Sequence, residues 1–300
     1  MTAFPNPDGS KACSSQERRF QLMFVVCSGL TVLAGTVAII ATGAGPSLWL
    51  RNPVMWCVTV ALCARLRRWR MPPPWLLVVM IAALALSILV GPHQSGVHRW
   101  LAVGPVLLNI AALIMPAAIV LMDRGCRMHG RPGYALAALA MAAMLAWQPD
   151  MSQLTGLIAA AVMWALAQRR WRSLVWIAPV ALLALLICAS RPDPLAAVPH
   201  VEGIFQLAAD VSPLLALGGG LCLLLTSLSP LAVANDVNQR PAAVALSAYF
   251  LVSGFAWLYG AFPVPLAGYG ISFILGWLIG ATTLLIQQAK GNYRGLTGPD

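Results

Sequence analysis

Long apolar runs, each bounded by charged residues or by Pro and Gly, recur along the whole chain. A helix needs about 20 residues to cross the ~30 Å hydrocarbon core of a bilayer, whereas barrel strands are roughly ten alternating residues. Helices also satisfy all their backbone polar groups within lipid. The pattern therefore predicts an all-α, polytopic membrane bundle of about ten transmembrane helices. They are expected at residues 20–43, 47–64, 74–91, 103–122, 133–148, 151–168, 173–189, 212–235, 242–261 and 269–288.

Composition supports a membrane chain, because 60% of the residues are hydrophobic and only 9% are charged. The net charge of +10 is better explained by basic cytoplasmic loops than by nucleic-acid binding, and no nucleic-acid partner is expected. The seven cysteines lack any C-x-x-C spacing, so neither a metal site nor a disulfide framework is predicted.

The distribution of Lys and Arg predicts the topology. With both termini in the cytoplasm, ten spans place 16 of the 19 basic residues inside and leave Arg51, Arg99 and Arg191 outside. Residues 1–19 and 289–300 are then cytoplasmic tails, and 20–288 form one membrane domain. The outer side holds most candidates for chemistry.

Two outer segments combine polar residues with helix-breaking ones. Gly96 to Pro105 contains Arg99 and Trp100, and Gly104-Pro105 is expected to start the fourth helix. Arg99 is placed either to grip a lipid phosphate or to reach lipid headgroups without a specific ligand. In Gln148-Pro149-Asp150, Pro149 forms a tight turn, and Asp150 either caps the next helix or pairs with Arg99.

The longest outer loop, residues 190–211, begins with an extended proline-rich stretch. A short amphipathic or re-entrant helix is expected after His200-Val201-Glu202-Gly203. Glu202 is then either a partly desolvated general base or a solvated loop acid. In Phe262 to Ser272, two prolines and two glycines surround Tyr269, which predicts either a cavity wall or an interfacial turn.

These four segments resemble motifs of the SEDS family of bacterial shape, elongation, division and sporulation proteins. The family has G-x-x-R-W-x-x-x-G-P before the fourth span, Q-P-D before the sixth, H-T-D-F-I-F before the eighth and P-F-x-S-Y-G-G-S before the tenth. They match Gly96 to Pro105, Gln148 to Asp150, His200 to Phe205 and Pro265 to Ser272.

The resemblance implies a peptidoglycan glycosyltransferase in the bacterial inner membrane that polymerises lipid II, usually with a class B penicillin-binding protein. It implies no certain cofactor and leaves open a divalent cation on the pyrophosphate. Glu202 would deprotonate the acceptor's 4-hydroxyl, and Arg99 would steady the leaving pyrophosphate. The other substrate-binding residues implied are Trp100, Asp150, His200, Tyr269 and Ser272.

The chain departs from the family at several positions. Glu202 stands where the family has Asp, Val201 where it has Thr, and Gly268 where it has Ser. In the fourth span the family's Glu and Lys are Ala112 and Met115. Because both members of the pair are replaced, neither leaves an unpaired charge buried in the membrane.

Two other functions therefore remain open. One is a catalytically inactive scaffold that recruits a penicillin-binding protein or another envelope or division component. The other is a lipid-precursor transporter, which the scarcity of charge at span centres disfavours.

Overall fold

The computed structural model describes residues 7–68, 72–73, 75–129, 132–191 and 193–294. Residues 1–6 of the expected N-terminal tail and 295–300 of the expected C-terminal tail lie outside the described residues. Residues 7–19 of the expected N-terminal tail are helical and continuous with the first apolar helix. The ten predicted runs correspond to helices along most of the chain.

The helices are α1 (Pro7–Ala41), α2 (Pro46–Trp49), α3 (Arg51–Leu66), α4 (Leu76–Leu89), α5 (Ile110–His129), α6 (Pro132–Trp147), α7 (Met151–Ala167), α8 (Trp171–Ala189), α9 (Ile204–Val211), α10 (Pro213–Leu228), α11 (Arg240–Gly254) and α12 (Ile271–Arg294). Two 3₁₀ turns, Ser229–Val233 and Ala256–Leu258, follow α10 and α11. The strands are β1 (Trp100–Val103) and β2 (Val106–Asn109).

Five helical stretches of the described residues are long and apolar enough to span a bilayer, and four more apolar helices are shorter. The long ones are Ser15–Ala41, Pro46–Leu66, Trp171–Ala189, Pro213–Val233 and Arg240–Leu258. An all-α, multi-pass membrane bundle is therefore confirmed. The count of ten spans stays a prediction.

The expected start of the fourth helix at Gly104-Pro105 is wrong. These residues form the turn of an antiparallel hairpin, in which Trp100 pairs with Asn109 and Val103 with Val106. Gly104 has φ +59°, a conformation that favours glycine. Helix α5 begins only at Ile110, because the Asn109 side chain caps it by accepting from the Ala112 N–H at 3.0 Å.

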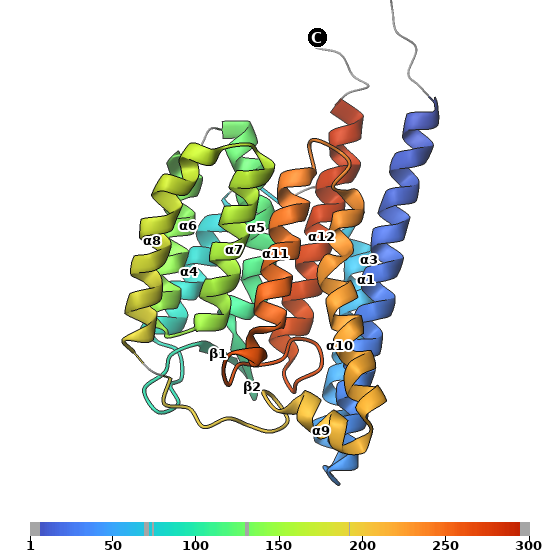
Figure 1. The fold of residues 1–300 in the computed structure, drawn as a ribbon, viewed down its shortest axis with the longest axis vertical. Coiled ribbons are helices and arrows are strands. Elements are labelled where there is room, and N and C mark those ends of the chain that lie inside the picture. Colours follow the sequence, from blue (N-terminus) through green and yellow to red (C-terminus); the bar gives the residue numbers. More distant parts are fainter. Residues whose placement is uncertain (1–6, 69–71, 74, 130–131, 192, 295–300) are drawn as a thin grey trace, which may run out of the picture.

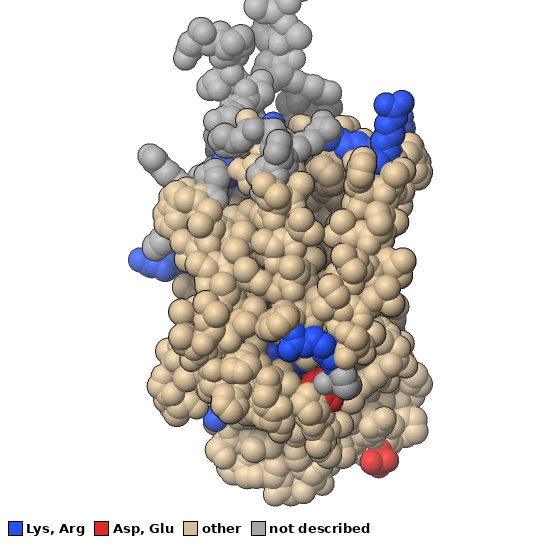
Figure 2. Space-filling model, turned by 90° about the vertical axis from the view of Figure 1, so that its left-hand side faces the viewer, with Lys and Arg blue, Asp and Glu red and all other residues tan. Residues whose placement is uncertain are grey.

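The helices lie roughly along the long axis of the molecule (Figure 1). Helices α4, α6 and α8 form one side, α1, α3 and α10 the other, and α5, α7, α11 and α12 the middle. The hairpin and α9 lie at the lower end, which we call the loop end. The opposite end, where Arg67, Arg127 and Arg170 lie, we call the basic end. In Figure 2 most of the visible face is uncharged, as expected of a surface that contacts lipid.

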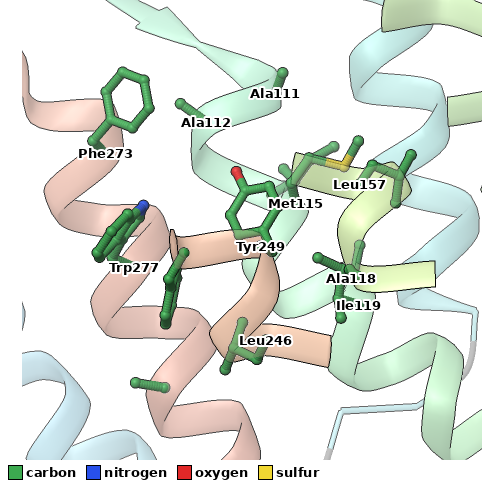
Figure 3. Close-up of a cluster of buried hydrophobic side chains, with 14 of the residues drawn as sticks. Ala111, Ala112, Met115, Ala118, Ile119, Leu157, Leu246, Tyr249, Phe273 and Trp277 are labelled. Carbon is green, nitrogen blue, oxygen red and sulfur yellow. The ribbon is translucent and has the colours of Figure 1, made fainter. Parts of the chain in front are cut away.

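The central helices pack through small residues. A Cβ on Gly276 of α12 would lie 2.0 Å from the Ala112 carbonyl oxygen of α5, and one on Gly280 would lie 2.3 Å from Pro116 Cβ. This small-xxx-small spacing lets two helix backbones approach closely. Ala112 and Met115, where the family has its charged pair, are both 0% exposed. Figure 3 shows them in an apolar cluster with side chains such as Tyr249 and Trp277.

Candidate active site at the loop end

Five of the seven sequence-predicted site residues lie on three parts of the loop end, and the other two, Asp150 and Ser272, lie at the start of α7 and of α12. The hairpin carries Trp100 and is preceded by Arg99, the segment from Asp193 to Gly203 carries His200 and Glu202, and the segment 262–270 carries Tyr269. The segment 193–198 has no helix, and α9 follows at Ile204, as the proline pattern predicts.

Arg99 is buried, with 7% of its surface exposed, and two of its guanidinium nitrogens have protein partners. Nε donates to the Gln148 carbonyl at 3.1 Å, and Nη2 donates to the Pro149 carbonyl at 2.6 Å. Nη2 also lies 2.6 Å from Oδ2 of Asp193. The hairpin, the turn before α7 and the long loop are thus tied together by one cation.

Asp150 caps the following helix and does not pair with Arg99. It is buried and caps α7, accepting from the Gln153 N–H at 3.3 Å and from the Ser152 hydroxyl at 3.0 Å. The carboxylate that pairs with Arg99 is Asp193, which the sequence analysis did not select. Its only signal was an acid between prolines in an outer loop.

Glu202 is a partly exposed carboxylate that is held by its own loop. Its Oε2 accepts from the Val198 N–H at 2.7 Å. Burial raises the pKa of Glu202 above the usual range, and the charge of Asp193 raises it further. Hydrogen bonds from backbone N–H groups and the charge of Arg99 act in the opposite direction. The charges of Asp193 and Arg99 thus act on the pKa of Glu202 in opposite directions and less strongly than its burial.

The loop that carries Glu202 is fixed to the segment 262–270 by backbone contacts. The His200 carbonyl accepts from the Tyr269 N–H at 2.7 Å, and the Val201 carbonyl accepts from the Val264 N–H at 3.1 Å. A Cβ on Gly268 would lie only 2.4 Å from the Val201 carbonyl oxygen. In this chain a side chain at 268 would therefore force the two closely packed segments apart.

The segment 262–270 is non-helical, as predicted, but it is buried in protein. Asn52 donates from Nδ2 to the Gly268 carbonyl at 2.8 Å and accepts from the Gly270 N–H at 3.3 Å. The guanidinium carbon of Arg51 lies 5.2 Å from the centre of the Tyr269 ring. Sequence reasoning missed Asn52, whose signal was an amide at the start of an apolar run.

Ser272 and His200 contact residues that are far away in the sequence. Ser272 accepts through Oγ from the Asn109 N–H at 2.9 Å, and Asn109 is the residue that Trp100 faces across the hairpin. His200 Nε2 lies 3.0 Å from the hydroxyl of Thr42, the residue directly after α1. These contacts hold the hairpin and the long loop to α12 and to the end of α1.

A polar cavity of about 420 Å³ adjoins Arg99 at the loop end. His98, Gln148 and Arg191 contribute to its lining. His98 Nδ1 and Gln148 Oε1 are buried and have no hydrogen-bond partner, and Arg191 stacks on Trp147 at 4.0 Å. All seven predicted site residues belong to the described part of the chain, and none of them lines this cavity.

Figure 2 shows a basic and an acidic group next to one another in the lower half of the face on view. In the described ranges, no group of three or more His, Cys, Asp or Glu side chains is arranged to hold a metal ion. The loop end offers a carboxyl with a raised pKa, an ion pair between buried Arg99 and exposed Asp193, and a polar cavity.

No family model matches this chain. No curated protein matches its sequence either. Solved structures match its fold closely. The rod shape determining protein RodA of Thermus thermophilus has a TM-score of 0.67 at 17% identity, covering 89% of this chain and 96% of that one.

Two further structures show the same likeness. A point mutant of the same RodA has a TM-score of 0.69 at 18% identity, covering 89% of this chain and 96% of that chain. A chain from a structure of a peptidoglycan synthase complex that coordinates polymerization and crosslinking has a TM-score of 0.69 at 19% identity, covering 89% and 97%. The protein therefore has the RodA fold, the fold that its SEDS-like motifs predicted.

Proposed function

We propose that this protein is a SEDS-like peptidoglycan glycosyltransferase that polymerises lipid II at the outer face of the bacterial plasma membrane. The observation that carries the proposal is the grouping of Glu202 with the Arg99–Asp193 ion pair at one end of a RodA fold. A carboxyl with a raised pKa suits a general base, and a guanidinium suits a pyrophosphate.

In the proposed reaction Glu202 takes the proton of the acceptor sugar's 4-hydroxyl. The freed oxygen attacks the donor's anomeric carbon, and the bond from that carbon to the pyrophosphate oxygen breaks. The leaving lipid pyrophosphate keeps the electron pair, and Arg99 balances its growing negative charge. Because Arg99 is neutralised by Asp193, the pyrophosphate must displace Asp193 to reach it.

The remaining substrate contacts are proposed for Trp100, His200 and Tyr269. Asp150 and Ser272 act by positioning, since both already hold backbone N–H groups. A class B penicillin-binding protein is proposed as partner. A matching structure is described as a complex that coordinates polymerization with crosslinking, and this supports such a pairing.

The test is a gel assay of lipid II polymerisation by purified protein, with and without a co-expressed class B penicillin-binding protein. Glu202→Gln should lower the rate by about 10²- to 10⁴-fold, and Glu202→Asp should keep residual activity. Asp210→Asn, which changes an exposed acid on the neighbouring α9, is the matched control and should polymerise normally. Full activity of Glu202→Gln would refute the proposal.

A second candidate function is a catalytically inactive scaffold for a penicillin-binding protein or another envelope or division component. It is favoured by the apolar burial of Ala112 and Met115, which replaces the family's charged pair. Under this alternative, wild-type protein makes no polymer in either assay, yet it co-purifies with the penicillin-binding protein, and Glu202→Gln leaves that complex unchanged.

A further inference from the structure

A large apolar groove extends toward the basic end between α6, α7 and α8, with α5 beneath it. Its volume is about 700 Å³, and small side chains such as Ala138, Ala142 and Ala161 line it. Protein interiors are otherwise packed as densely as organic crystals. The groove is far larger than the ~30 Å³ of one water molecule, and its walls are apolar. A hydrocarbon chain therefore suits it better than water.

The groove ends at a cationic group. Arg170 contributes to the lining, and its Nη1 is buried without a hydrogen-bond partner. The guanidinium carbon lies 5.7 Å from the centre of the Trp164 ring, which also lines the groove. Helix α8 starts directly after Arg170 without a side-chain cap, and Ser173 in its first turn lines the groove. A helix N-terminus and an adjacent arginine together favour a phosphate.

The one acid in the groove lining is balanced by its neighbours. Asp123 forms an ion pair with Arg127 at 2.6 Å. It also accepts from Trp164 Nε1 at 2.9 Å and from Gln287 Nε2 at 3.1 Å. Beyond the groove, Arg169 and Arg172 are exposed on either side of the α8 start. The mouth of the groove is therefore positive.

From this arrangement we infer a binding site for one anionic glycerophospholipid of the leaflet at the basic end. An acyl chain occupies the alanine-lined groove, and the phosphate meets Arg170 and the first turn of α8. Basic pockets between membrane helices bind anionic headgroups by this combination of hydrocarbon burial and charge. The site lies among α5 to α8 and is independent of Glu202 and of the proposed polymerase activity.

Native mass spectrometry of the purified full-length chain, delipidated and then titrated with defined lipids, tests this inference. Phosphatidylglycerol, phosphatidylcholine and a polyprenyl phosphate are the three probes. We expect one retained phosphatidylglycerol per chain, bound about tenfold or more tightly than phosphatidylcholine. Both lipids offer a phosphate to Arg170, but the positive choline group of phosphatidylcholine is repelled by Arg169, Arg170 and Arg172 at the mouth of the groove.

Arg170→Gln should abolish this preference, while Arg68→Gln, an exposed basic residue at the end of α3, should keep it. Ala161→Phe should displace the lipid by filling the groove. Ala138→Leu fills it from α6 and replaces that variant if its thermal unfolding shows misfolding. Equal binding of the two phospholipids, an unchanged preference in Arg170→Gln, lipid retention in both filled variants, or tighter binding of the polyprenyl phosphate would each overturn the inference.

Discussion

Arg99 is paired with Asp193, whose Oδ2 lies 2.6 Å from Nη2 of Arg99. The carboxylate of the long outer loop therefore occupies the place that the pyrophosphate of the proposed substrate would take. The ion pair closes the loop over the hairpin and the turn before α7. Substrate binding then requires an exchange of one anion for another. That exchange can be measured.

Replacing Asp193 should strengthen substrate binding. Asp193→Asn removes the competing carboxylate, and Arg99 keeps its two carbonyl partners. We expect about tenfold tighter binding of lipid II, since hydrogen bonds to charged groups contribute roughly 1.5–3 kcal/mol. Microscale thermophoresis with fluorescent lipid II measures the dissociation constant. Unchanged or weaker binding, with Asp210→Asn as the reference, would contradict the displacement of Asp193.

The pH dependence of polymerisation should move in the same variant. Burial and Asp193 raise the pKa of Glu202, so the ionised base form is lost at a higher pH than for an ordinary Glu. Removing the Asp193 charge lowers this pKa, and the ionised form then persists to lower pH. The acid limb of the rate profile should therefore shift downward in Asp193→Asn. An upward shift or none would show that Glu202 is not the titrating base.

Gly268→Ala should disturb the loop that carries Glu202. The added Cβ would lie 2.4 Å from the Val201 carbonyl oxygen and 2.8 Å from that of Val264, so one of the two segments must move. A displacement of about 1 Å can cost roughly a hundredfold in rate, and the polymerisation assay should show such a loss.

Gly220→Ala in α10 is the control, because nothing lies within 4 Å of its added Cβ. It should keep full activity, and alanine is preferred to glycine in a helix by about 1 kcal/mol. Equal activity of the two alanine variants would mean that the contact between Val201 and Gly268 does not position Glu202.

Asn52→Ala should destabilise the same loop from the side of α3. It removes the partners of the Gly268 carbonyl and the Gly270 N–H, and an unsatisfied buried polar group costs about 1–3 kcal/mol. A lowered midpoint of thermal unfolding in detergent is expected. No change in that midpoint would mean that water or lipid headgroups satisfy these atoms.

Restoring the family's charged pair tests whether its loss is structural. Ala112→Glu alone should be strongly destabilising, because it buries a charge in the apolar cluster of Figure 3. Adding Met115→Lys, three residues away on the same helix, should recover part of the loss by about 0.5–3 kcal/mol. A double-mutant cycle on unfolding midpoints measures this coupling. Strict additivity would argue that the two positions do not communicate.

The helical bundle was predictable because hydrophobic run length is a strong signal in membrane chains. The hairpin was not, because Val, Leu and Ala around Gly104-Pro105 suit a strand as well as a helix, and only pairing across the turn distinguishes them. The cap at Asp150 followed from local sequence. The partner of Arg99 could not be predicted in this way. Asp193 lies nearly a hundred residues further along the chain and meets Arg99 only in the folded protein, so no local sequence pattern indicates the pair.

The contacts between the loop of His200 and Val201 and the segment ending at Tyr269 are made by main-chain atoms. The position of the loop that carries the Glu202 carboxylate is therefore set by peptide groups, which every amino acid possesses. Such an arrangement tolerates mutation of the flanking side chains, so valine can replace threonine at 201 without moving the acid. At 268, in contrast, an added side chain would meet the Val201 carbonyl oxygen of that loop, so in this chain the close approach of the two segments depends on glycine.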